Sequence, residues 1–332
     1  MDSGTESVPR SSPPQPDGAD LPAARSRSRR YSAGIRSLFA VAPWTAVVGL
    51  GVFLVIVGLV IAAPLVTSYD PTEQVLLDRL QRPSSLHWLG TDQLGRDVFS
   101  RLLYGGRFSL AIAAITVGIS ALVGAIVGAV SGYVGGTFDD VMMRIVDLLV
   151  PFPEVVVALL VVAIMGPGFT TLIIALTVIG WTPYARLVRG LTLSIKTQGY
   201  IEAAHALGCS HSFVISKHVL PNALKPILAL TFLRFGHKLI AVGALSFLGL
   251  GVQPPDSDWG AMLADALPYM QRVPSLILSP GLAIFLSALA ITLAGQGIAI
   301  MLDPKLRTAR RARRMGAEEP PSGALADGAL NL

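Results

Sequence analysis

The stretch FSLAIAAITVGISALVGAIVGAVSG, residues 108–132, decides the fold class because it holds no charged side chain. About 20 apolar residues span the hydrocarbon core of a bilayer as an α-helix, which rises about 1.5 Å per residue. Further runs without charge lie between Arg36 and Asp70, Glu154 and Arg186, Lys238 and Asp256, and Arg272 and Asp303. The chain is therefore predicted to be an all-α integral membrane protein.

The composition agrees with a membrane protein and excludes several other classes. Of the 332 residues, 52% are hydrophobic and 14% are charged, whereas soluble domains carry about 25% charged residues. These values exclude a soluble enzyme, a nucleic-acid-binding domain and a disulfide-stapled secreted module. The single cysteine, Cys209, cannot form an intramolecular disulfide. The sequence contains no P-loop, HExxH or GxSxG motif, and we expect neither enzyme activity nor a cofactor.

The apolar runs predict six membrane-spanning helices. The stretch 142–185 is too long for one crossing, and Gly166-Pro167-Gly168 marks a turn inside it. The predicted spans are 44–66, 108–132, 142–165, one that starts at 170, 224–248 and 276–302.

Basic residues predict how these spans are oriented, because loops rich in Lys and Arg stay in the cytoplasm. Such residues precede the first span, follow the last, and lie between the fourth and fifth spans. The loop between the fifth and sixth spans instead carries Asp256, Asp258 and Asp265 against Arg272. We therefore expect a multi-pass protein of the cytoplasmic membrane with both termini in the cytoplasm.

The chain divides into four predicted segments. Residues 1–36 are rich in Pro, Ser and Arg and read as a disordered cytoplasmic tail. Residues 37–107 hold the first span and an outer segment, and residues 108–302 hold the other five spans with a cytoplasmic loop at 190–225. Residues 303–332 form a second cytoplasmic tail.

The cytoplasmic loop contains the sequence YIEAAHALGCSHSFVISKHVLPNALKP at residues 200–226. It predicts a short helix through 202–207, which ends at Gly208 because glycine readily takes the left-handed conformation. Ala203 and Ala204 would make a small knob that fits a groove on a partner protein. A surface hairpin without a partner is the alternative reading.

Two chemical alternatives are weaker. His205, Cys209, His211 and His218 lie in this loop, and the first two share one helical face as zinc ligands would. The remaining spacings match no zinc pattern, so we predict no metal site. An intramembrane protease built on Ser120 would need a histidine base, and His237 is the only histidine within a predicted span.

The cytoplasmic loop resembles the EAA loop of ABC-importer permeases through Glu202-Ala203-Ala204, Gly208 and the later Leu220-Pro221. Three more segments resemble the dipeptide/oligopeptide/nickel branch of that family. They are WLGTDQLGRD at 88–97, ALSFLGLGVQPP at 244–255 with WGAML at 259–263, and DPKLR at 303–307. The resemblance covers residues 36–307 and is to the second of two permease subunits, which carries the LGTD segment.

This resemblance implies the transmembrane domain of a type I ABC importer. It implies a heterodimer with a sister permease, two ABC ATPase subunits, an extracytoplasmic substrate-binding protein and a di- or oligopeptide substrate. Glu202, Ala203, Ala204 and Gly208 would dock the ATPase. Import of nickel or a nickel chelate is the alternative, and a stand-alone secondary transporter or channel is a remote one. No nucleic acid is implied as a partner.

Three cationic or titratable residues interrupt the predicted fifth span, namely Arg234, His237 and Lys238. Charges at that depth face the bundle interior or a wet cavity, because contact with lipid is costly. One reading pairs the charges internally with Glu154 or Asp147. A second reading makes the three residues a cationic wall on the translocation path, suited to a peptide carboxylate. A third is that the boundary of the helix is shifted.

Two further patterns carry packing predictions. Gly124, Gly128 and Gly132 repeat every fourth residue of the second span, which allows close approach of a neighbouring helix from this chain or from the sister permease. In the LGTD segment, Asp92 is predicted to cap a helix, with Asp97 and Arg101 paired one turn apart. Contact of this segment with the binding protein is the functional alternative.

Overall fold

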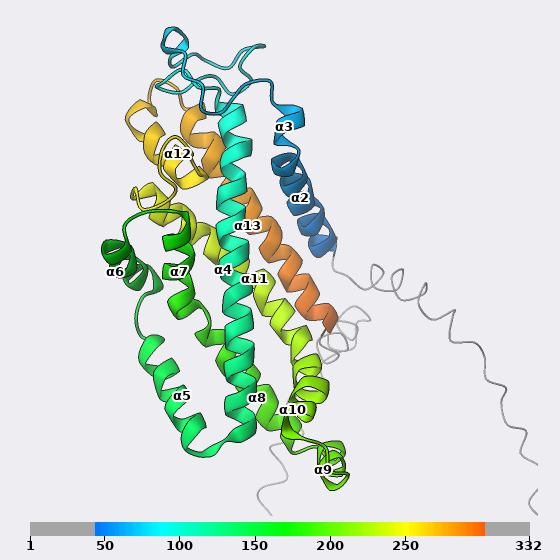
Figure 1. Ribbon diagram of the computed structural model, residues 1–332. Coiled ribbons are helices and arrows are strands. Elements are labelled where there is room, and N and C mark those ends of the chain that lie inside the picture. Colours follow the sequence, from blue (N-terminus) through cyan, green and yellow to red (C-terminus); the bar gives the residue numbers. More distant parts are fainter. Residues whose placement is uncertain (1–43, 303–332) are drawn as a thin grey trace, which may run out of the picture. The chain divides into compact units, whose positions relative to one another are not determined.

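The computed structural model describes residues 44–302, so the predicted tails at 1–36 and 303–332 and the DPKLR motif lie outside the described residues (Figure 1). The described part is helical, with short 3₁₀ turns at Leu76–Asp78 and Leu267–Tyr269 and a π-helical turn at Ile215–Val219. Its α-helices are α2 (Trp44–Ile61), α3 (Ala63–Val66), α4 (Val98–Val134), α5 (Gly136–Leu149), α6 (Glu154–Met165), α7 (Phe169–Gly180), α8 (Thr182–Lys196), α9 (Gly199–Ala206), α10 (His211–Val214), α11 (Leu220–Phe247), α12 (Trp259–Ala266) and α13 (Ser275–Leu302).

Helix α4 runs through the middle of the bundle and contacts α7, α8 and α11, while α13 packs between α11 and α2 (Figure 1). At 37 residues it is about 55 Å long, which exceeds the roughly 30 Å hydrocarbon core. One end of the bundle carries residues 67–97 and α12, and we call it the loop end. The other carries α9 and α10, and we call it the hairpin end.

Five helical segments are long and apolar enough to cross a membrane: Trp44–Ile61, Val98–Val134, Phe169–Lys196, His211–Phe247 and Ser275–Met301. They confirm the all-helical membrane fold and five of the predicted spans. The predicted span that starts at residue 170 corresponds to Phe169–Lys196. This segment is long because α8 continues α7 after a short break at Trp181.

The predicted third span, 142–165, is wrong as a continuous helix. Helices α5 and α6 meet at an angle of 90°, and only if this bent pair counts as one span does the described part contain six. Pro151 and Pro153 cause the break, because proline lacks an N–H donor and disfavours helical conformation in the residue before it. Pro153 is itself extended, with φ −58° and ψ 124°, directly before Glu154 begins α6.

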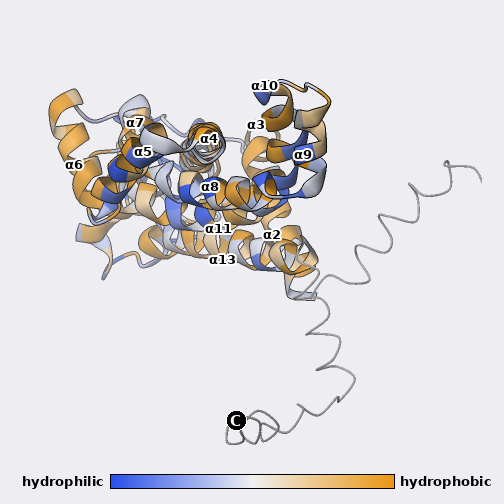
Figure 2. Ribbon diagram, turned by 90° about the horizontal axis from the view of Figure 1, so that it is seen from below, coloured by the Kyte–Doolittle hydropathy of each residue, from blue (hydrophilic) through white to orange (hydrophobic). Residues whose placement is uncertain are grey.

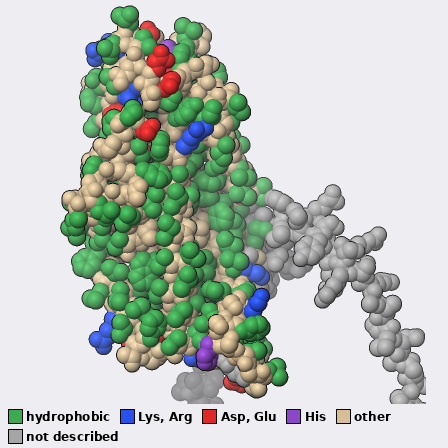
Figure 3. All heavy atoms as spheres, viewed as in Figure 1, with side chains coloured by type: hydrophobic (Ala, Val, Ile, Leu, Met, Phe, Trp, Pro, Cys, Tyr) green, Lys and Arg blue, Asp and Glu red, His purple; other side chains and the backbone are tan. Residues whose placement is uncertain are grey.

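The outer surface of the described part is mainly apolar in the region that a bilayer would surround. Hydrophobic side chains cover the middle of the face in Figure 3, and charged side chains gather toward its two ends. Helix α6 is hydrophobic after its first residue, Glu154 (Figure 2), and its Leu160 and Ile164 are 61% and 77% exposed. Hydrophilic segments appear on α5, α8 and α9 in the same view. Apolar residues therefore face outward where lipid or a partner helix would lie.

The glycine repeat of the second span faces α8 of the same chain. A Cβ atom added at Gly124 or Gly128 would lie 2.4 Å from the carbonyl oxygen of Trp181 or Ala185, respectively. At Gly132 the corresponding distance, to a carbonyl oxygen of α8, is 3.0 Å. The repeat therefore brings α4 and α8 together within one subunit, rather than leaving a face for the sister permease.

Candidate functional site

At the hairpin end, residues 199–219 form a compact hairpin that we call the 199–219 hairpin. Helix α9 ends in a left-handed glycine, Gly208 with φ +78°, and the N–H of Cys209 donates to the carbonyl of Ala204 at 3.0 Å. This is the turn that the sequence predicts. Ser210 then caps α10 by accepting from the N–H of Phe213 at 3.3 Å.

The predicted docking residues have different positions on this hairpin. Ile201 and Ala204 are buried against Val214 and Val219, so they hold the two arms together. Glu202, Ala203 and Gly208 are exposed, and beside them Leu207 is 83% exposed. Such a leucine at a hairpin tip, next to small residues, presents an apolar knob. Sequence reasoning missed Leu207, although an apolar residue beside a turn glycine was a visible signal.

Polar contacts tie the hairpin to the bundle. The ring Nδ1 of His211 lies 3.1 Å from the hydroxyl of Tyr133 at the end of α4. The ammonium of Lys196 donates to the carbonyl of Tyr133 at 2.7 Å. Nearby, Arg189 on α8 binds both carboxylate oxygens of Asp139 on α5 at 2.6 Å. His211 therefore joins the hairpin to α4, and Lys196 and Arg189 join α8 to α4 and α5.

Two histidines of this loop, His211 and His218, have aromatic neighbours. His218 contacts the rings of Tyr200 and Phe213, and His211 contacts the ring of Tyr133. Among the described side chains of residues 44–302, which do not include that of His205, no three His, Cys, Asp or Glu side chains gather in a way that could hold a metal ion.

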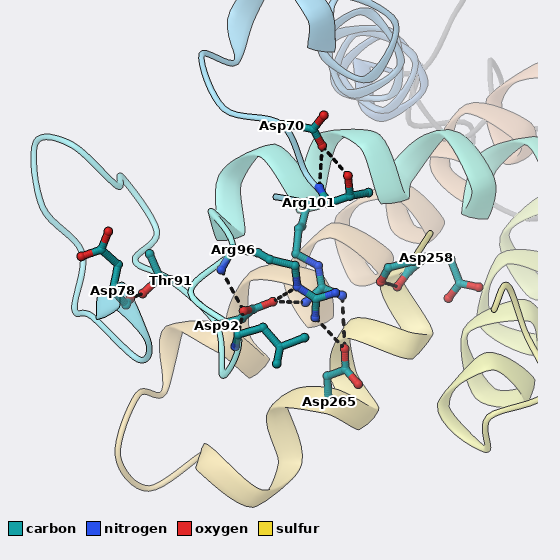
Figure 4. A network of polar contacts seen from close by, with 11 residues as sticks. Asp70, Asp78, Thr91, Asp92, Arg96, Arg101, Asp258 and Asp265 are labelled. Carbon is teal, nitrogen blue, oxygen red and sulfur yellow. Dashed lines mark hydrogen bonds and ion pairs between the residues drawn. The ribbon is translucent and has the colours of Figure 1, made fainter. Parts of the chain in front are cut away.

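At the loop end, the LGTD segment folds around one carboxylate, Asp92 (Figure 4). One of its oxygens accepts from the backbone N–H groups of Leu94 and Arg96 at 2.8 and 3.0 Å. The other accepts from the guanidinium groups of Arg96 and Arg101 at 2.7 and 2.5 Å. Arg101 also reaches Asp265 of α12 at 3.2 Å. The network joins the outer segment to α4 and α12.

Two predictions for this segment are wrong in detail. Asp92 does not cap a helix; Asp97 caps α4, accepting from the N–H of Ser100 at 2.8 Å. Asp97 and Arg101 do not pair, because the Asp97 carboxylate points to the helix start and to His87 Nδ1 at 3.0 Å. Arg101 turns instead to Asp92 and Asp265.

Replacing Asp92 by asparagine should destabilise the protein strongly. Asp92, Arg96 and Arg101 are all buried, and removing one partner of a buried pair typically costs about 3–5 kcal/mol. We expect a clearly lower Tm for the purified, detergent-solubilised protein.

Asp70→Asn is the matched control. Asp70 is exposed, and hydrogen bonds from the hydroxyl and N–H of Thr72 hold its pKa below the usual value. It has no buried cation to strand, so its Tm should stay near that of the wild type. Equal Tm values for both variants would show that the Asp92 network does not support the fold.

The three residues of the fifth span have separate surroundings on α11. Lys238 is 3% exposed, pairs with Glu154 at the start of α6, and donates to the carbonyl of Leu176 at 2.9 Å. Arg234 is half-buried, and His237 is exposed, with its Nδ1 2.9 Å from the carbonyl of Leu233. The internal pairing considered from the sequence therefore exists for Lys238.

Asp147, the other acid considered for this pairing, has a different partner. Its carboxylate binds the guanidinium of Arg186 at 2.5 Å on the exposed surface between α5 and α8.

Two family models match separate parts of the chain. Residues 121–308 match the model of the binding-protein-dependent transport system inner membrane component. The chain belongs to this family. Residues 44–83 match the N-terminal transmembrane domain of oligopeptide transport permease C. These matches confirm the family that the EAA and LGTD motifs indicated, and with it a multi-pass protein of the inner membrane.

Two members of the family with similar sequences carry the same description. The chain is 40% identical to the glutathione transport system permease protein GsiD of Pectobacterium atrosepticum over 79% of this chain and 87% of that protein. It is 42% identical to the protein of the same name in Escherichia coli O6:K15:H31 over 76% of this chain and 84% of that protein.

A solved structure shows the same fold. A chain of the inward-facing MetNI methionine ABC transporter superposes with a TM-score of 0.50 at 19% identity, covering 61% of this chain and 96% of that one. At this identity the likeness shows the fold alone, which is that of an ABC importer permease.

Proposed function

We propose that the chain is a permease subunit of an ABC importer for small peptides, and that it pairs with a sister permease in the cytoplasmic membrane. The observation that carries this proposal is the likeness to glutathione transport permeases along most of their length, together with the match to oligopeptide transport permease C. Glutathione is itself a tripeptide, so both findings concern peptide cargo. ATP hydrolysis would belong to two partner ATPases, and cargo would arrive from an extracytoplasmic binding protein.

The 199–219 hairpin is the proposed docking element for an ATPase. Its exposed tip, with Glu202, Ala203, Leu207 and Gly208, offers a small apolar knob beside one negative charge. Ala204 supports the knob from inside. Because Tyr133 and Lys196 connect the hairpin region to α4 and α8, movement of a docked ATPase would move the central helices.

Orientation follows from the same proposal. The hairpin end would face the cytoplasm, where basic residues such as Arg186, Lys196 and Lys217 lie, and the loop end would face the binding protein. Helices α2 and α13 run in opposite directions, so residues 44 and 302 point toward the hairpin end (Figure 1). In the proposed orientation these two helix ends would lie on the cytoplasmic side.

A nickel importer is the second candidate within the branch, and transport assays separate the two. The permease pair, the ATPases and the binding protein should be reconstituted together in vesicles. Addition of ATP on the ATPase side should drive uptake of a radiolabelled tripeptide, while ADP should not. Nickel uptake without peptide uptake would overturn the peptide proposal, and peptide uptake without any ATPase would favour a secondary transporter.

A further inference from the structure

We propose that Arg234 is the residue of this chain that binds a carboxylate of the cargo during translocation, and that Lys238, one turn further along α11, has a structural role only. This inference rests on the proposed function, since it names the chemical group of the peptide that the path reads. The inference assigns different roles to Arg234 and Lys238, which the sequence suggested as parts of one cationic surface.

Lys238 is buried by other helices of the same chain and is not accessible to a transported ligand. Its ammonium group pairs with Glu154 of α6 and donates to the carbonyl of Leu176 in α7. A Cβ atom added at Gly180 would lie 3.0 Å from this ammonium and 2.5 Å from the hydroxyl of Ser120. Helices α4, α6 and α7 thus close around Lys238, and no room remains for a ligand.

Arg234, unlike Lys238, has no ion-pair partner among the described residues. It lies near the middle of α11 and is half-buried, and within residues 44–302 no acidic side chain forms an ion pair with it. The two acids that the sequence suggested as partners are already paired: Glu154 binds Lys238, and Asp147 binds Arg186. The positive charge of Arg234 is therefore left for a group outside the described chain.

The position of Arg234 within the span disfavours contact with lipid. An unpaired guanidinium in mid-bilayer is strongly unfavourable against hydrocarbon, so intramembrane charges face a partner protein or water. Tyr184 of α8 packs in the cluster that contains Ile227 and Leu230 of α11, and its buried hydroxyl has no hydrogen-bond partner among the described residues. His237, three residues further on, is exposed. Polar groups from α8 and α11 therefore gather at this position.

A peptide carboxylate fits this site by charge and geometry. Guanidinium groups bind carboxylates through two parallel hydrogen bonds, which an ammonium cannot reproduce. The attraction is stronger in a partly dehydrated cavity than in bulk water, where the high dielectric constant screens it. Every unblocked peptide carries a carboxylate at its C-terminus, so one arginine on the path can recognise the whole substrate class.

The test measures ATP-driven uptake of two tripeptides, one with a free C-terminal carboxylate and one amidated, by the complete transporter in vesicles. For each peptide the rate is divided by that of the wild type, so the binding protein's own preference cancels. Arg234→Gln should lower uptake of the free acid at least about tenfold and change uptake of the amide less than about twofold. Arg234→Lys should give an intermediate value, because it keeps the charge but loses the bidentate geometry.

Lys238 supplies the matched control. Lys238→Met strands Glu154 and should lower the amount of protein in the membrane, and Lys238→Met with Glu154→Gln should restore it. Neither variant should change the ratio of acid to amide uptake. The two residues lie on the same helix, so a general disturbance of α11 would affect both.

Three results would overturn the inference. Equal loss of both peptides in Arg234→Gln at normal abundance would remove the carboxylate-reading role. Loss of the sister permease from purified Arg234→Gln would assign the residue to a subunit contact. A changed acid-to-amide ratio in the Lys238 and Glu154 double variant would place Lys238 on the path. Wild-type vesicles that import neither peptide would contradict the proposed function itself.

Discussion

Exchange of Gly208 for proline is expected to abolish ATP-driven transport while the protein still inserts into the membrane. Gly208 has φ +78°, and proline fixes φ near −65°, so the turn between α9 and α10 cannot form. The exposed tip with Glu202 and Leu207 would then lose its shape. Uptake by the complete transporter should fall to background at matched protein levels, and the ATPases should separate from the permease during purification.

Controls separate the shape of the hairpin from its surface chemistry. Gly199, at the start of α9, also has open space around its Cα but no left-handed φ, so Gly199→Ala should transport normally. Glu202→Arg and Leu207→Asp leave the turn intact and change only exposed side chains, and both should impair ATPase binding. Normal uptake in Gly208→Pro and Glu202→Arg would refute the docking assignment.

Replacement of Gly128 by leucine should have the largest effect on folding. A Cβ atom there would lie 2.4 Å from the carbonyl oxygen of Ala185, a backbone atom that cannot move without displacing α8. Overpacking typically costs about 1–3 kcal/mol, and a clash with backbone lies at or above the upper end of that range. Membrane levels of the variant should fall to about a tenth or less of the wild type, as measured by immunoblot of isolated membranes.

Gly118→Leu is the comparison that isolates this contact. Gly118 belongs to the same helix, and nothing lies within 4 Å of the position that its Cβ would take. The two variants therefore add the same side chain to α4 and differ only in whether α8 is in the way. If both variants reached the same membrane level, the close approach of α4 and α8 would not determine stability.

Local signals in the sequence predicted much of this molecule. Long apolar runs located five spans, because contact with lipid disfavours charge along most of a crossing helix. Gly208 was predicted as a left-handed turn residue because its conformational freedom is a property of the residue itself. The motif around Glu202 and the LGTD segment identified the family.

Long-range choices could not be predicted in the same way. The sequence offered two acids, Glu154 and Asp147, as partners for Lys238. Only the three-dimensional path of α6 selects Glu154, which lies 84 residues earlier in the chain. The glycine repeat of α4 is visible in the sequence, but the sequence does not indicate which helix packs against it. Pro151 and Pro153 were visible, but the mainly apolar composition of residues 142–165 suggested one continuous span rather than a bend of 90°.

The pair between Glu154 and Lys238 also has a consequence for biosynthesis. The ribosome delivers the chain from the N-terminus, so α6 reaches the membrane long before α11 has been made. During that interval Glu154 has no cation to pair with, and a lone carboxylate resists entering hydrocarbon. Helix α6 would therefore settle only when the fifth span arrives, which makes completion of this subunit a late, concerted step rather than a helix-by-helix addition.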